Sequence, residues 1–216
     1  MKFFIDTANL DEIKEAASYG ILDGVTTNPS LMAKEGIIDQ TARIKAICQI
    51  TPAPVSAEVL STDFEAMLEE GRALASLAKN VVVKIPMTMA GLQATKVLSG
   101  EGVRVHVTLI FSAIQGLLAA RAGAAYVSPF VGRLDEIGVD GLQVVGDILT
   151  IYDSYHLETE VIVASVRHSQ HVTRSALLGA DICTIPLAII RQLAAHPLTD
   201  KGLAAFLSDH AKLAAH

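Results

Sequence analysis

A lysine lies near the end of an apolar run, where its charge requires an explanation. The segment from Asn80 to Met87 reads NVVVKIPM, and its β-branched residues are typical of a strand buried in a parallel sheet. A buried ammonium group is costly unless it is paired, solvated or neutralised. A neutral amine can attack a ketone and form a Schiff base, which is the usual chemistry of a desolvated lysine. Lys84 is therefore our candidate nucleophile.

Polar residues also end the other apolar runs of the chain. Side chains two residues apart lie on one face of a strand, so polar groups at these ends can converge. Two acids among them are available for proton transfer, a threonine could hold a shared water, and an asparagine could bind a substrate hydroxyl. The pairing of a serine and an arginine late in the chain suits phosphate. In chain order, these residues are Asp6, Thr26, Asn28, Glu58, Lys84, Thr108, Ser128, Ser165 and Arg167.

Structural roles compete with this chemistry at several positions. Asp6 could cap the first helix, and Glu58 could form a plain ion pair with Lys84. Ser165 could simply hydrogen-bond to solvent, and Arg167 could pair with a surface acid. The turn at residues 26–30 could simply start a helix, because proline suits the first helical position.

Three histidines are possible metal ligands by residue type. His168 and His171 have a spacing that could hold a metal, but no acid-flanked third ligand is evident in the sequence, so we interpret them as surface residues. His106 lies midway along an apolar run, where a histidine is more often a satisfied core residue than a ligand. We expect no metal and no organic cofactor.

Short apolar runs alternate with amphipathic stretches from end to end. Eight such runs give about 27 residues per unit, which fits a βα repeat. No linker or low-complexity tract divides the chain, and no glycine-rich fingerprint of a doubly wound sheet follows the first run. We therefore expect one (β/α)8 barrel domain over residues 1–216, with its chemistry at the carboxyl ends of the strands. The predicted strands are Phe3–Asp6, Gly24–Thr27, Val55–Val59, Val81–Ile85, Val103–Leu109, Ala125–Phe130, Glu160–Ser165 and Ile182–Ile185.

A final segment follows the eighth unit, and residues 199–213 are predicted to form a terminal helix. Leu203, Phe206 and Leu207 share one face of it. This helix could close its own barrel or dock on a neighbouring subunit, and periodicity does not separate the two.

Composition excludes some classes of protein. A net charge of −6 and a pI near 5.6 argue against a nucleic-acid surface. The hydrophobic content of 51% is high, but no segment reads as a membrane span. An acid at position 6 interrupts any signal-peptide core, so we expect a cytoplasmic protein. Cys48 and Cys183 are far apart and are expected to be reduced.

Motifs along the whole chain resemble the small bacterial transaldolases, a group that also contains fructose-6-phosphate aldolases. The matching segments, in family order, are FFIDTAN, GVTTNPSL, VSAEV, VVVKIPMT, VTLIFSA, AYVSPFVGRLDEIG, VIVASVRH and HPLTDKGL. The resemblance implies a (β/α)8 barrel with Lys84 as the Schiff-base lysine and Asp6 as the acid–base residue. It also implies that Glu58 and Thr108 position a catalytic water and that Asn28 binds the sugar. By the same similarity, Arg133, Ser165 and Arg167 bind the substrate phosphate, with Thr26, Ser128 and Phe130 near the substrate.

Two positions separate the activities within this family. Aldolases resemble one another in a glutamine and a tyrosine where this chain has Glu58 and Phe130, which is the transaldolase pattern. The sequence departs from the common pattern at Met89, His106 and Ile114, which leaves catalytic efficiency open rather than reaction type.

The resemblance implies a transaldolase of the non-oxidative pentose phosphate pathway. It would move a dihydroxyacetone unit from sedoheptulose 7-phosphate or fructose 6-phosphate to glyceraldehyde 3-phosphate or erythrose 4-phosphate. The alternatives are a fructose-6-phosphate aldolase that releases free dihydroxyacetone and a sugar-phosphate-binding barrel without catalysis. Family members of this size imply a homodecamer of two stacked pentamers. From the charge and the hydropathy of the chain we expect no nucleic-acid or membrane partner.

Overall fold

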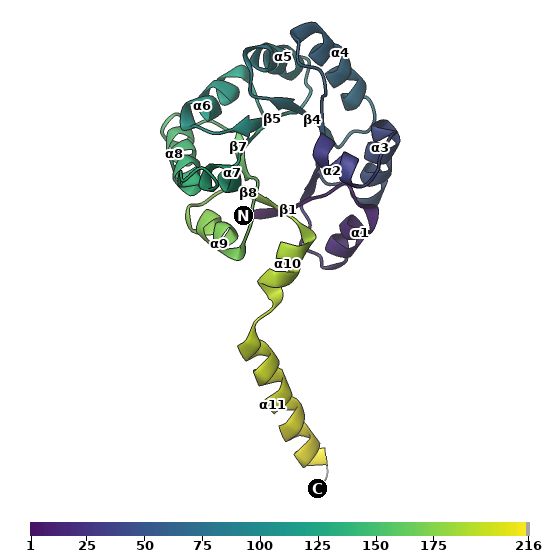
Figure 1. Cartoon of the computed structure of the whole chain (residues 1–216), viewed down its shortest axis with the longest axis vertical. Helices are drawn as coiled ribbons and strands as arrows, with labels where there is room; N and C mark the ends of the chain where they lie inside the picture. The colour runs from purple at the N-terminus through teal and green to yellow at the C-terminus, as the bar shows by residue number, and fades with distance from the viewer. Residues whose placement is uncertain (215–216) are drawn as a thin grey trace.

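The computed structural model describes residues 1–214, and its eight strands close into a parallel barrel (Figure 1). Each strand pairs in parallel with the next along the chain, and β8 pairs with β1. This confirms the predicted (β/α)8 fold, and each predicted strand lies within two residues of the observed one. The strands are β1 Lys2–Asp6, β2 Gly24–Thr26, β3 Val55–Glu58, β4 Val81–Pro86, β5 Val105–Ile110, β6 Tyr126–Pro129, β7 Glu160–Val163 and β8 Ile182–Ile185.

Helices surround the barrel and mostly begin at polar caps that follow the strands. Asn9 caps α1, Asn28 caps α2 and Thr88 caps α5, each with a side-chain oxygen that accepts a backbone N–H. The helices among the described residues are α1 Leu10–Ser18, α2 Pro29–Lys34, α3 Gln40–Ile50, α4 Phe64–Ala75, α5 Met89–Gly100, α6 Ala113–Ala122, α7 Val131–Asp135, α8 Gly141–Ser154, α9 Ser169–Leu177, α10 Leu187–Ala194 and α11 Pro197–Ala214.

Two apolar layers result from the alternation of side chains along the strands. One set of strand residues packs outward beneath the helices and forms the larger core. The other set fills the inside of the barrel, where Phe4, Val82, Tyr126, Ile162 and Ile182 form a separate buried cluster. Lys84 follows Val82 by two residues, so it shares this inward face one layer closer to the carboxyl ends. The inner cluster therefore provides an apolar floor beneath the lysine.

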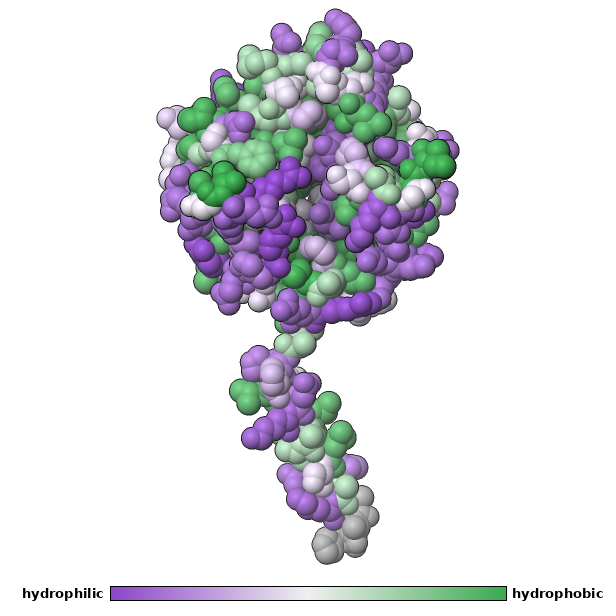
Figure 2. Space-filling model, viewed as in Figure 1, coloured by the Kyte–Doolittle hydropathy of each residue, from purple (hydrophilic) through white to green (hydrophobic). Residues whose placement is uncertain are grey.

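The last helix, α11, extends away from the barrel (Figure 1). Its apolar side chains are exposed: 57% for Leu203, 75% for Phe206 and 62% for Leu207. Figure 2 shows hydrophobic side chains along this helix beside hydrophilic ones. The sequence left open whether this helix closes its own barrel or docks on a neighbouring subunit. In the structure it does not close its own barrel. Among residues 1–214, no helix combines the length and apolar character needed to span a membrane.

Candidate active site

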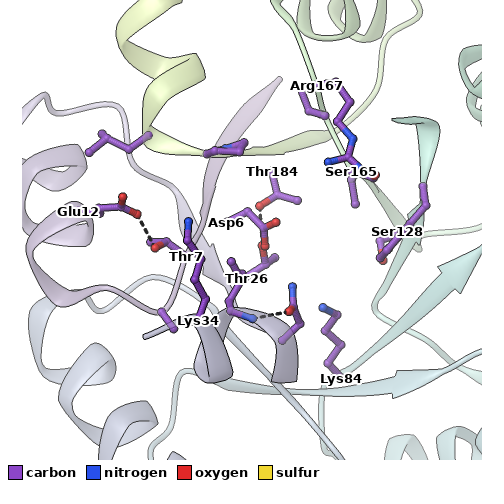
Figure 3. Close-up of a pocket in the computed structure, with 18 of the residues that line it drawn as sticks. Asp6, Thr7, Glu12, Thr26, Lys34, Lys84, Ser128, Ser165, Arg167 and Thr184 are labelled. Carbon is purple, nitrogen blue, oxygen red and sulfur yellow. Dashed lines mark hydrogen bonds between the residues drawn. The ribbon is translucent and has the colours of Figure 1, made fainter. Parts of the chain in front are cut away.

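A cavity of about 370 Å³ opens at the carboxyl ends of the strands (Figure 3). It is the place where a barrel presents its chemistry. Most of the candidate residues from the sequence line it, although they come from four strands and from the segments that follow β2, β6 and β7. The predicted residues that line the cavity are Asp6, Thr26, Asn28, Lys84, Ser128, Phe130, Arg133, Ser165 and Arg167.

Lys84 reaches this cavity from β4 and is only 4% exposed. Its Nζ donates a hydrogen bond to the backbone oxygen of Thr27 at 3.0 Å and lies 3.0 Å from Oε2 of Glu58. The ion pair between Lys84 and Glu58, the structural alternative to catalysis, is therefore present. The same carboxylate is also close enough to accept a proton from the ammonium group, so the pair is compatible with chemistry at Nζ.

Asp6 ends β1 and does not cap the first helix, since Asn9 fills that role. Thr26 donates a hydrogen bond to Oδ1 of Asp6 at 2.7 Å, and its oxygen lies 2.6 Å from that of Thr184. Because the single Thr26 proton goes to Asp6, Thr184 must be the donor in the second bond. Burial raises the pKa of Asp6 above its ordinary value of 3.8, while the charge of Lys84 and the bond from Thr26 partly oppose the shift. Asp6 is thus suited to exchange protons.

Glu58 and Thr108 lie at the edge of this arrangement rather than in the cavity lining. Glu58 contacts Lys84 but lines a separate pocket, which Ile38 and Leu60 also line. Thr108 is fully buried, and its Oγ1 accepts a hydrogen bond from Ser128 at 3.1 Å. The register of β5 against β6 shifts between Val107 and Ile110, a stretch that contains Thr108 and also Leu109, whose φ is +61°.

Two arginines give the far side of the cavity a positive character. Arg133 follows β6, and its Cζ lies 5.0 Å from the ring centre of Phe130. Arg167 follows β7, and its Nη2 lies 2.8 Å from Oε1 of Glu136. Ser165 is held at a φ of +60°, a strained conformation that often occurs at binding sites. These groups can bind an anion between β6 and β7.

Asn28 lies at the entry to α2. Its Oδ1 accepts the Leu31 N–H at 2.9 Å, as a helix cap does. Since the oxygen is used in this way, the amide N–H groups are the part of the side chain available to a ligand in the cavity.

The sequence analysis assigned no role to several polar side chains that line the cavity, which are Thr7, Glu12, Lys34, Glu35 and Thr184. His106, which was expected only in the core, lines the cavity as well. Thr184 follows the inward-facing Ile182 by two residues, so strand alternation could have placed it. His106 is 1% exposed, and its Nδ1 lies 3.0 Å from Oγ of Ser56. Among the described residues no group pairs with its Nε2, so the expectation of a satisfied core histidine was wrong in that respect. Burial and the neighbouring Lys84 charge hold the pKa of His106 well below 6.5.

The interpretation of His171 as a surface residue was also wrong. Its side chain is buried, and the ring of His168 stacks on it with centres 3.8 Å apart. An acid completes this group: Asp135, from α7, has a carboxylate oxygen within 4.8 Å of a ring nitrogen of each histidine. The sequence did not reveal it, because Asp135 lies 36 positions from His171.

Comparisons with known proteins find relatives that match nearly the whole chain. The protein-family model described as Transaldolase/Fructose-6-phosphate aldolase matches residues 3–216. A "Probable transaldolase" of Syntrophobacter fumaroxidans is 61% identical over 216 residues, which cover 99% of this chain and 98% of that protein. A "Probable transaldolase" of Shouchella clausii is 59% identical and covers 97% of this chain and 96% of its own length. A third, from Desulfotalea psychrophila, is 60% identical, covering 98% of this chain and 99% of its own.

Proposed function

This chain belongs to the transaldolase/fructose-6-phosphate aldolase family, and from that premise we propose that it transfers a dihydroxyacetone unit between sugar phosphates through a Schiff base on Lys84. One observation carries the proposal. The inward Nζ of Lys84 lies beside the Glu58 carboxylate, and Asp6 lies in the same cavity. An amine, a proton acceptor and a second acid are the groups that this reaction requires.

The first half of the reaction follows from these positions. Glu58 takes a proton from Lys84, and the neutral Nζ attacks the ketone carbon of a ketose phosphate. Loss of water from the carbinolamine gives a protonated imine. Asp6 removes the proton of the hydroxyl on the fourth carbon, the bond between the third and fourth carbons breaks, and its electrons move into an enamine. An aldose phosphate leaves, and the three-carbon enamine remains on Lys84.

The second half reverses these steps with a new partner. The enamine carbon attacks the aldehyde of an acceptor, and Asp6 returns its proton to the oxygen that forms there. Water then hydrolyses the imine and regenerates Lys84. Asn28 offers N–H donors for a sugar hydroxyl, and Arg133, Ser165 and Arg167 offer a site for the phosphate. We propose fructose 6-phosphate or sedoheptulose 7-phosphate as donors, and glyceraldehyde 3-phosphate or erythrose 4-phosphate as acceptors, in the non-oxidative pentose phosphate pathway of the cytoplasm.

A fructose-6-phosphate aldolase is the second candidate function. Phe130 favours transfer over this alternative, because a phenyl ring in the cavity lining offers no hydroxyl to help water protonate the enamine. The enamine is then left for an aldehyde acceptor. Free dihydroxyacetone in the absence of an acceptor would identify the aldolase.

Borohydride trapping tests the Schiff base. The protein is incubated with fructose 6-phosphate, reduced with borohydride and digested for mass spectrometry. We expect Lys84 to gain the mass of a three-carbon unit, and a Lys84→Ala variant to gain nothing and to lose turnover. An unmodified Lys84, or transfer activity in the variant, would show that the lysine and Glu58 form only a structural pair.

A further inference from the structure

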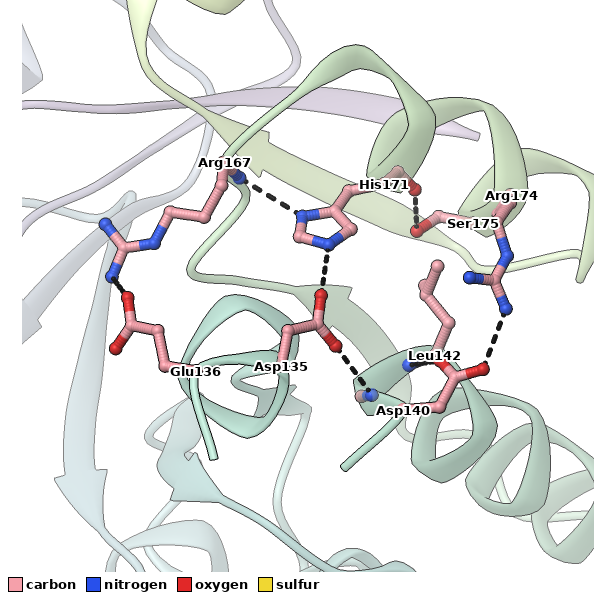
Figure 4. A network of polar contacts seen from close by, with 9 residues as sticks. Asp135, Glu136, Asp140, Leu142, Arg167, His171, Arg174 and Ser175 are labelled. Carbon is pink, nitrogen blue, oxygen red and sulfur yellow. Dashed lines mark hydrogen bonds and ion pairs between the residues drawn. The ribbon is translucent and has the colours of Figure 1, made fainter. Parts of the chain in front are cut away.

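His171 uses both ring nitrogens to hold the turn that carries Arg167 (Figure 4). Nδ1 accepts the backbone N–H of Arg167 at 3.1 Å, so it carries a lone pair there. A neutral ring must then have its proton on Nε2, which lies 2.6 Å from Oδ2 of Asp135 and donates to it. The same assignment argues against a metal at this cluster, since a protonated Nε2 has no lone pair for an ion.

Asp135 connects three helices through its carboxylate. It ends α7, its Oδ2 accepts from His171 in α9, and its Oδ1 accepts the N–H of Gly141 at the start of α8, at 3.1 Å. The bonds from Gly141 and His171 lower the pKa of Asp135 in spite of the opposing effect of burial. The carboxylate is therefore a fixed acceptor, and it ties the position of the His171 ring to α7.

The next residue of the chain holds the other end of Arg167. Oε1 of Glu136 lies 2.8 Å from Nη2 of Arg167, and both side chains are more than half exposed. An exposed pair of this kind is weak, so a phosphate with two negative charges can displace the carboxylate. Arg167 is thus fixed firmly at its backbone by His171 and loosely at its guanidinium by Glu136.

We propose that Asp135, His171 and Glu136 form a positioning network that presents Arg167 to the phosphate of the substrate. Asp135 and His171 fix the backbone of the turn. Glu136 pairs with the guanidinium of Arg167 before the phosphate binds, and the phosphate then replaces Glu136 as the partner of the guanidinium. None of the three needs to touch the substrate. This inference rests on the proposed function and adds residues that determine its preference for phosphorylated donors.

The test compares a phosphorylated donor with an unphosphorylated one, fructose 6-phosphate against fructose, with the same aldehyde acceptor. His171→Phe, which loses both hydrogen bonds, should raise KM for fructose 6-phosphate about tenfold, because a small misplacement of a binding group has effects of this size or larger. Its kcat and its activity on fructose should change little. His171→Asn retains an acceptor near the position of Nδ1 and should recover much of the loss. Equal losses on both donors, or no loss on either, would overturn the positioning role.

Glu136→Gln should act in the opposite direction. Loss of the competing carboxylate should lower KM for fructose 6-phosphate by roughly two- to fivefold and leave fructose unaffected. Asp140→Asn is the matched control, because it removes the ion pair with Arg174 at 3.0 Å on the neighbouring loop and can still cap α8. A raised KM in Glu136→Gln, or an equal effect of the control, would contradict the displacement of Glu136.

Calorimetric titration with inorganic phosphate separates this inference from the proposed function. The native protein should bind phosphate, and His171→Phe should weaken that binding about tenfold, as for the donor. If the native protein traps no three-carbon unit yet phosphate binding depends on His171, the transaldolase assignment fails and the network stands. If trapping succeeds and phosphate binding does not depend on His171, the network fails alone.

Discussion

Side chains with unlike tasks share one small cavity, and the charge of each depends on the others. Lys84 is paired with Glu58, Asp6 is tied to Thr26, and His106 is kept neutral beside the lysine. Burial raises the pKa of Asp6 and lowers that of His106, because it disfavours the charged form of each group. The charge of Lys84 opposes the shift of Asp6 and adds to that of His106, so the protonation of these side chains is coupled through the lysine.

Phe130→Tyr should raise the release of free dihydroxyacetone. Phe130 lines the cavity, so a hydroxyl on its ring could orient a water to protonate the enamine. We expect release from fructose 6-phosphate without an acceptor to rise by roughly tenfold or more, measured by coupled reduction of the product. Phe111→Tyr is the control, because Phe111 packs edge-on against Phe130 at 5.8 Å outside the cavity lining. Unchanged release in Phe130→Tyr would remove this position from the explanation of transfer.

His106 should make the protein less stable in mild acid. Its pKa in the folded state lies well below 6.5, so between the two values the unfolded chain binds a proton that the folded protein does not. Above pH 6.5 His106 does not reduce the free energy of unfolding. The free energy of unfolding falls as the pH is lowered from 6.5 towards the pKa of His106 in the folded state. The loss can reach about 1.4 kcal/mol per pH unit.

Urea denaturation at several pH values, at one protein concentration, checks this dependence. His106→Asn should flatten the loss of free energy of unfolding between pH 6.5 and about 5. The exposed His210→Asn on α11 is the control and should retain the native slope. A parallel slope in all three proteins would mean that His106 does not stay neutral in the fold.

The helix α7 and the turn after β7 meet at a glycine. The N–H of Gly132 donates to the backbone oxygen of Ser165 at 3.1 Å, and a Cβ on this residue would lie 2.1 Å from the same oxygen. Only a residue without a side chain permits the contact. The element that follows β6 is therefore joined directly to the turn that carries Ser165 and Arg167.

Gly132→Ala should destabilise the protein and weaken phosphate binding together. The backbone must separate to admit the methyl group, and overpacking of this kind costs about 1–3 kcal/mol. Gly146→Ala, in the middle of α8, meets only Leu178 at 3.5 Å and should be stabilising by about 0.5–1 kcal/mol through helix propensity. Urea denaturation and phosphate titration of both variants provide the check. Similar effects of the two substitutions would contradict a specific role for the contact.

The sequence predicted the strands well because most of their residues are buried on both faces. Apolar runs such as Val81–Ile85 are too hydrophobic for an exposed position, so they indicate buried strands. The polar residues that end these runs meet because the carboxyl ends of all barrel strands lie on one face. The sequence was a poorer guide to hydrogen bonds that join different helices and strands. The bond from His171 to Asp135 joins α9 to α7, and the lone Nε2 of His106 depends on what its neighbours leave unpaired. Neither follows from spacing along the chain.

The terminal helix α11 is the feature that a single chain does not explain. Leu203, Phe206 and Leu207 lie at helical spacing and are each more than half exposed, although the rest of the chain buries a large core. A contiguous exposed apolar face of this kind marks an interaction site. We propose that α11 docks on a second copy of the chain, in the homodecamer expected from the family resemblance.

Phe206→Glu should therefore lower the mass of the particle in solution. A charge at this position cannot be buried without a partner, so the assembly should dissociate towards the 22.9 kDa chain when light scattering is measured after size exclusion. Ser208→Glu is the control, because it adds the same charge to α11 away from the face shared by Leu203, Phe206 and Leu207. The native protein and the control should share one large mass. Two results would show that this face does not assemble the protein: a native mass of one chain, or a Phe206→Glu particle as large as the native one. A different partner would then have to cover the apolar face of α11.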